Sequence, residues 1–120
     1  MKGTEIKRFG VTARYADATV FNGLLNAVEV PAEEHGDITT QMQSLLQSLE
    51  RTLQVAGSDK AHLLMATIYL VDMADYDGMN AVWEKWLPAG AAPARACVKV
   101  AGLARSGWRV EVAVTAAVSG

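Results

Sequence analysis

A chain of 120 residues has the usual size of a single domain, and we expect one domain over residues 1–120 that buries about two thirds of its unfolded surface. The formal net charge of −2 provides no attraction to nucleic acid or to an anionic membrane. A single cysteine excludes an internal disulfide, no Cys/His cluster has zinc-site spacing, and no segment resembles a signal peptide or a membrane span. The sequence is therefore typical of a cytoplasmic protein.

The apolar content is high for a chain of this size. Apolar residues make up 51% of the sequence, whereas only 20% of the residues are charged. Permanent subunit interfaces resemble protein cores in composition. The composition therefore indicates that part of the surface is covered by another subunit.

Two extended segments are predicted at the amino end, at residues 4–9 and 18–30. Asn22 and Gly23 interrupt the second segment, and this dipeptide is typical of a two-residue hairpin turn. Pro31 and the polar run after it end the segment. We therefore expect a hairpin or a bulge near the amino end.

An amphipathic helix is predicted from Ile38 to just before Gly57, because apolar residues recur there at intervals of three or four positions. Asp37 and Thr39 both have side chains suited to capping its amino end. One face of this helix should be buried. The opposite, solvent-facing side is predicted to comprise Gln41, Gln43, Gln47, Glu50 and Arg51.

Residues 61–71 are apolar at both odd and even positions, which is the pattern of a central strand covered on both faces. A second helix follows, and aspartates load its start with the negative charge that a helix dipole favours. Pro88 and Gly90 end it. Its apolar stripe is predicted to comprise Tyr76, Met79, Val82, Trp83, Trp86 and Leu87.

Two strands are predicted at the carboxyl end, and each carries charged residues in apolar surroundings. In the first, Arg95, Cys97 and Lys99 point to one face and form a polar row on a buried strand. In residues 110–118, Glu111 is a lone carboxylate among small residues, opposite a face of valines. Such charges are costly to desolvate unless they pair with each other or with a backbone carbonyl, or face a ligand cavity.

The predicted order is strands, helix, strand, helix, strand, strand. This order indicates an α/β (α+β) sandwich with both helices on one face of a sheet. The simplest arrangement of the last two strands is a terminal hairpin. The uncovered sheet face, rich in valine and alanine, would then require a partner subunit.

Two chemical roles are disfavoured by the residues themselves. Cys97 has no base in sequence reach, because the two histidines are distant, so it is not expected to be a nucleophile. The basic residues near the carboxyl end lack interleaved aromatic residues and any recognisable nucleic-acid-binding module. No metal site is predicted.

Several motifs resemble those of the RidA family, also called the YjgF or endoribonuclease L-PSP family. They are Pro-Ala-Arg-Ala-Cys-Val at residues 93–98, followed after a turn by Val-Glu-Val-Ala at 110–113. Ala-Gly-Ser-Asp-Lys before the central strand and Met-Asn-Ala-Val-Trp in the second helix are similar to the family's middle section. Arg-Tyr-Ala-Asp near residue 14 and the helix with two tryptophans resemble a YoaB-like branch. The resemblance covers nearly the whole chain.

This resemblance implies a chorismate-mutase-like fold, with a mixed sheet and two helices packed on one face. It also implies a homotrimer that binds a small carboxylate-bearing ligand in three clefts between subunits. In this family the last strand is inserted inside the sheet, so the resemblance replaces the terminal hairpin. The neighbouring subunits would supply the missing cover of the sheet.

The resemblance also implies an activity that needs no metal or cofactor. RidA proteins hydrolyse reactive enamines and imines, such as 2-aminoacrylate, to 2-keto acids and ammonia. By motif match, Arg95 would bind the substrate carboxylate and Glu111 would position or activate the attacking water. Cys97 would line the cleft, and Tyr15 would match an aromatic residue that closes it.

One stretch departs from the family pattern. Ala27, Val28 and Glu29 stand before Pro31, where many members carry a Ser-Gly pair. Loss of the glycine removes a close backbone approach, and Glu29 would place a carboxylate near the cleft, where it disfavours an anionic substrate. The alternative function is therefore a non-catalytic trimer that binds small carboxylated metabolites or acts as a regulator. RNA cleavage is a poorer third option, because the chain is acidic and has no histidine pair.

Overall fold

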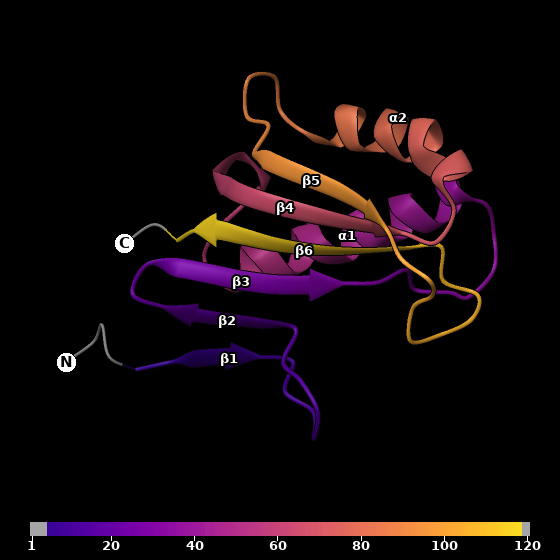
Figure 1. Ribbon diagram of the computed structural model, residues 1–120. Coiled ribbons are helices and arrows are strands. Elements are labelled where there is room, and N and C mark those ends of the chain that lie inside the picture. The colour runs from indigo at the N-terminus through magenta and orange to yellow at the C-terminus, as the bar shows by residue number, and fades with distance from the viewer. Residues whose placement is uncertain (1–4, 119–120) are drawn as a thin grey trace.

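The computed structural model describes residues 5–118, which form one mixed sheet and two α-helices (Figure 1). The elements in chain order are β1 (Lys7–Phe9), β2 (Ala18–Phe21), β3 (Leu24–Glu29), α1 (Ile38–Val55), β4 (Leu63–Leu70), α2 (Tyr76–Trp86), β5 (Ala94–Lys99) and β6 (Val110–Ala117). Short 3₁₀ turns precede β4 and α2. Of the first predicted segment, residues 7–9 form a strand, and Thr4 lies outside the described residues.

The hairpin between β2 and β3 confirms the amino-terminal prediction. Asn22 and Gly23 have φ angles of 54° and 82°, the left-handed conformation that both central residues of a type I′ turn require. The strands pair in register, with Val20 opposite Leu25 and Phe21 opposite Leu24. The turn dipeptide therefore fixes which side chains face the core.

The sheet has the strand order β1-β2-β3-β6-β4-β5. The last strand lies between β3 and β4 and is antiparallel to both, whereas β4 and β5 are parallel. The terminal hairpin expected from strand order alone is therefore wrong, and the inserted last strand is confirmed. The insertion leaves β5 at an edge, where Val98 is 41% exposed, so the prediction that β5 is a buried strand is also wrong.

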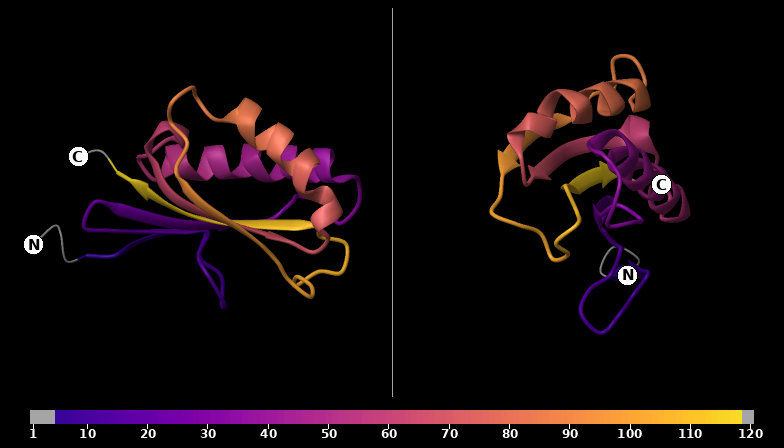
Figure 2. Two further views of the ribbon diagram at one scale, coloured as in Figure 1. Left: turned by 45° about the horizontal axis from the view of Figure 1, so that its top comes forward. Right: turned by 90° about the vertical axis from the view of Figure 1, so that its right-hand side faces the viewer.

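Both helices cover the same face of the sheet, as predicted (Figure 2). Asp37 caps α1 by accepting a hydrogen bond from the Thr40 backbone amide at 2.9 Å. Trp83 of α2 is buried against the core, and its ring centroid lies 5.6 Å from that of Trp86. The sheet contributes the valines predicted for the inner face of β6, namely Val110, Val112 and Val114.

The other face of the sheet is not covered by any helix or strand of residues 5–118 (Figure 2). We call it the bare face. Its residues on the central strands are half-buried or exposed: Phe21, Leu24, Asn26, Val28, Met65, Thr67, Tyr69, Glu111, Ala113 and Thr115. The prediction that β4 is covered on both faces is therefore correct, in a single chain, for the face that packs against the helices but not for the bare face. Within residues 5–118, no helix is long and apolar enough to cross a membrane.

Candidate functional site

Arg95 is anchored to α2 by two hydrogen bonds. Its position in β5 is opposite Ala66 of β4, so its side chain is on the helix side of the sheet. One guanidinium nitrogen donates to the Asn80 side-chain oxygen at 2.7 Å, and the other terminal nitrogen donates to the Tyr76 hydroxyl at 3.2 Å. The guanidinium carbon also lies 5.8 Å from the centroid of the Tyr76 ring. These contacts fix the orientation of the planar group.

The positive charge of Arg95 is not neutralised by the part of the chain that the structure describes. Both anchoring side chains are uncharged, and no carboxylate among residues 5–118 forms an ion pair with this guanidinium. A guanidinium has five N–H donors, and two are used here. The remaining donors are suited to a planar, two-pronged contact with a carboxylate.

Cys97 lies two residues along the same strand and on the same side of the sheet as Arg95. Its side chain is half-buried and packs against the hydrophobic core. Burial raises the pKa of the thiol, and the positive charge of Arg95 opposes that shift only in part. The thiol is therefore neutral at physiological pH.

Glu111 lies on the bare face. It is opposite Tyr69 of β4 in the antiparallel pairing of β4 with β6 and is half-buried. No hydrogen bond or ion pair within residues 5–118 holds its carboxylate. Arg95 and Glu111 of one chain therefore point to opposite faces of the sheet, and a single chain does not bring them together.

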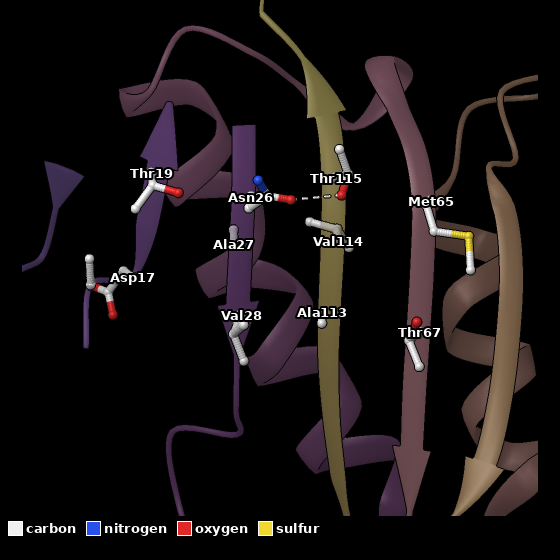
Figure 3. A pocket seen from close by; sticks show the side chains of 11 residues that line it. Asp17, Thr19, Asn26, Ala27, Val28, Met65, Thr67, Ala113, Val114 and Thr115 are labelled. Atoms are coloured by element: carbon white, nitrogen blue, oxygen red, sulfur yellow. Dashed lines mark hydrogen bonds between the residues drawn. The ribbon is translucent and has the colours of Figure 1, made fainter. Parts of the chain in front are cut away.

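A hollow of about 350 Å³ occupies the bare face, between the end of the β1–β2 loop and β4 (Figure 3). Its polar groups include Asn26 and Thr115, which are joined by a side-chain hydrogen bond of 2.8 Å. Sequence reasoning missed this hollow. The polar residues that alternate with buried ones in β2, β3, β4 and β6 are the signal that could have revealed it.

Tyr15 and Glu29 are placed apart from Arg95 in the chain. Tyr15 is 62% exposed on the loop between β1 and β2, which projects away from the helices (Figure 2). Glu29 ends β3 on the helix side and accepts a hydrogen bond from the Thr52 hydroxyl of α1 at 2.9 Å. Strands β6 and β4 separate β3 from β5, and at about 5 Å for each strand Glu29 is too distant to pair with Arg95.

Glu29 should make the stability of the protein depend on pH. Burial raises its pKa, and the hydrogen bond from Thr52 only partly offsets this. A carboxyl group whose pKa is raised by folding stabilises the protein below its unfolded pKa, and this contribution is lost as the pH rises through the folded pKa. We therefore expect Glu29→Gln to raise the melting temperature at pH 7 and above, and to have little effect below about pH 4. Thermal melts of both proteins across this range provide the measurement, and an equal difference at all pH values would contradict it.

The partners of Arg95 are the functional side chains that sequence reasoning missed. Asn80 belongs to the Met-Asn-Ala-Val-Trp motif and Tyr76 to the preceding Asp-Tyr pair. The sequence reveals the motif but not that its asparagine binds Arg95, because no local pattern predicts that α2 packs beside β5. The expected Tyr76 contribution to the apolar stripe is only partly correct, since its hydroxyl contacts Arg95.

Fold and site together define a class of protein: an α/β sandwich in which, over residues 5–118, neutral partners anchor an arginine at one sheet edge and one sheet face is uncovered. The endoribonuclease L-PSP family model matches residues 5–118. The chain belongs to this family, which includes the proteins called RidA, YjgF and RutC.

Three relatives illustrate how complete the similarity is. A RutC family protein from Haemophilus ducreyi is 39% identical over 95% of this chain and 97% of its own. The RutC family protein YoaB from Escherichia coli is 36% identical over 94% of this chain and 98% of its own. The crystal structure of NMB1025, a YjgF-family protein from Neisseria meningitidis, has a TM-score of 0.94 and 44% identity, and the match covers 98% of each chain.

Proposed function

We propose that the protein is an enamine/imine deaminase, which hydrolyses reactive 2-imino acids and their enamine tautomers, such as 2-aminoacrylate, to 2-keto acids and ammonia. Many members of the RidA family are deaminases of this kind, and the family match covers nearly the whole chain. The observation that carries the proposal is the anchored guanidinium of Arg95, which has neutral partners and free donors. It can bind the carboxylate that these substrates share.

The reactive cleft is formed by two copies of the chain. Arg95 and Glu111 lie on opposite faces of one sheet, so a ligand held by Arg95 cannot reach Glu111 of the same chain. A neighbouring subunit that lays its bare face against the β5 edge would contribute its own Glu111 and Tyr15. Repeated around a threefold axis, this head-to-tail contact closes a trimer with three clefts.

In this cleft Arg95 fixes the substrate carboxylate and therefore the position of the adjacent imine carbon. Water adds to that carbon while the carboxylate of Glu111 accepts one of its protons. When the imine nitrogen is protonated, this addition gives a neutral carbinolamine. Glu111 then returns its proton to the amino group, the C–N bond breaks as the hydroxyl group loses its own proton to form the keto carbonyl, and the nitrogen leaves as ammonia. No metal or cofactor takes part in these steps.

The proposal is tested by adding the purified protein to an amino-acid oxidase reaction that generates 2-imino acids. We expect keto acid and ammonia to appear faster than in the reaction without the protein. If the protein binds small carboxylates but does not accelerate release, the non-catalytic alternative replaces the proposal.

The protein is expected to sediment as a trimer at micromolar concentration, because the bare face exposes apolar side chains such as Val28 and Met65. Ala113→Arg should give smaller species, since it places a charge at the centre of that face. Gln47→Arg adds the same charge to the exposed side of α1 and should leave the trimer intact. A stable, folded wild-type monomer would contradict the prediction.

Cys97→Ala is expected to retain most of the activity. The reason is that burial raises the pKa of the thiol, so it is not available as a nucleophile. Turnover of an imino acid by the variant and by the wild type provides the measurement. A loss beyond about a hundredfold with the fold intact would make Cys97 a participant in the chemistry.

A further inference from the structure

Gln41 is buried, unlike the other glutamines of α1 that were predicted to face solvent. It is 2% exposed and is the only polar residue among residues 5–118 that is fully buried. The prediction that it lies on the solvent-facing side is therefore wrong, although it is correct for the exposed Gln43 and Gln47. A buried amide is costly unless its donors and acceptor are satisfied.

The amide of Gln41 is satisfied by the backbone just before β6. Its nitrogen donates to the Gly107 carbonyl at 2.9 Å and, more weakly, to the His35 carbonyl at 3.5 Å, while its oxygen accepts from the Arg109 amide at 2.8 Å. In a parallel sheet, the backbone of one residue makes the same two hydrogen bonds to the adjacent strand: it donates to one carbonyl and accepts from the amide two residues further along. The side chain of Gln41 thus makes the hydrogen bonds that a neighbouring strand would make. It does so just before β6 begins, where none of the described strands pairs with residues 107–109 on the side of α1.

The segment that Gln41 holds is also fixed from other directions. The backbone carbonyl of Arg109 accepts a hydrogen bond from the Val71 amide at 3.2 Å. The Arg109 side chain donates from Nε to the Gly36 carbonyl at 3.3 Å, and one of its terminal nitrogens forms an ion pair with Asp75 at 3.2 Å. At Gly107, a side chain would overlap with the Glu34 carbonyl. Residues 107–109 are therefore held against α1 and against the short turn that precedes α2.

Glu111 follows this segment by two residues. We infer that Gln41 is a positioning residue for Glu111: its amide fixes the start of β6 and thereby the place of the carboxylate in the cleft. This inference rests on the proposed function, because it concerns the reaction that Glu111 serves. Arg95 stands on β5 and is held by α2, so it should not depend on Gln41.

Two substitutions test the inference. Gln41→Met keeps the volume but removes the hydrogen bonds. Gln41→Glu keeps the shape, and its carboxyl group reproduces one donor and one acceptor only when it is protonated. Burial raises the pKa of such a group, so the protonated form gains population as the pH falls. Gln43→Met, an exposed change two residues away on the same helix, is the matched control.

The kinetic result expected for Gln41→Met is a fall in kcat of about tenfold to a hundredfold with little change in KM, because the water is misplaced while carboxylate binding is kept. For Gln41→Glu, the ratio of its kcat to that of the wild type should rise as the pH falls, with the KM ratio near one. A change of KM and kcat together, or wild-type kcat in both variants, would overturn the inference.

Hydrogen exchange supplies a readout that needs no activity. The Arg109 amide, which donates to Gln41, should exchange about ten times faster or more in Gln41→Met, as should the Glu111 amide, while amides in the middle of α1 keep their rates. Unchanged exchange at both positions would overturn the inference. If the wild type hydrolyses no imine, the proposed function fails, and the exchange rates still decide whether Gln41 fixes the start of β6.

Discussion

Substitution of Arg95 is expected to abolish most of the proposed deaminase activity. Loss of a desolvated, charge-assisted contact costs about 2–5 kcal/mol, which is about 30-fold to several thousandfold in kcat/KM if the contact is felt in the transition state. Arg95→Lys should fail nearly as badly as Arg95→Ala, because an ammonium keeps the charge but loses the two-pronged geometry. It also cannot maintain the same contacts with Asn80 and Tyr76.

The melting temperature separates this role from a structural one. The partners of Arg95 are neutral, so neither substitution leaves a buried carboxylate unpaired, and we expect a small change in stability. Arg105→Lys, in the exposed loop before β6, is the control and should change neither property. A sharp fall in melting temperature with activity per folded molecule preserved would refute the assignment of Arg95 to the substrate.

Local patterns in the sequence are sufficient for the elements that local forces specify. The Asn22-Gly23 turn, the Asp37 cap and the apolar spacing of α1 each act within a few residues, and the structure confirms all three. The place of β6 between β3 and β4 depends on contacts between distant segments. This position of β6 was predicted only from the resemblance to a known family.

The same distinction applies to the candidate site. The motif identifies Arg95, and strand alternation places Glu111 opposite the buried valines of β6. Alternation does not reveal that the two strands present these side chains on opposite faces, because that depends on how β5 and β6 each pair with β4. Gln41 was misassigned for a related reason: helix periodicity cannot anticipate a distant backbone segment that needs hydrogen bonds.

The opposite placement of Arg95 and Glu111 leads to a strong prediction about mixed assemblies. Arg95→Ala should lack carboxylate binding, and Glu111→Gln should lose about a hundredfold or more in turnover because the amide cannot accept a proton from water. Each variant alone is therefore expected to be nearly inactive. Each nevertheless keeps the residue that the other has lost.

Trimers assembled from equal amounts of the two variants should regain activity. A cleft works when the chain that supplies Arg95 carries only Glu111→Gln and its neighbour carries only Arg95→Ala, so random assembly restores about one quarter of the clefts. Co-refolding the two variants and measuring imine hydrolysis per trimer tests this. A mixture of Arg95→Ala with the double variant Arg95→Ala/Glu111→Gln is the control, since it contains no intact Arg95. If the mixture of the two single variants is no more active than the separate proteins, both groups act from the same chain and the proposed composite cleft is wrong.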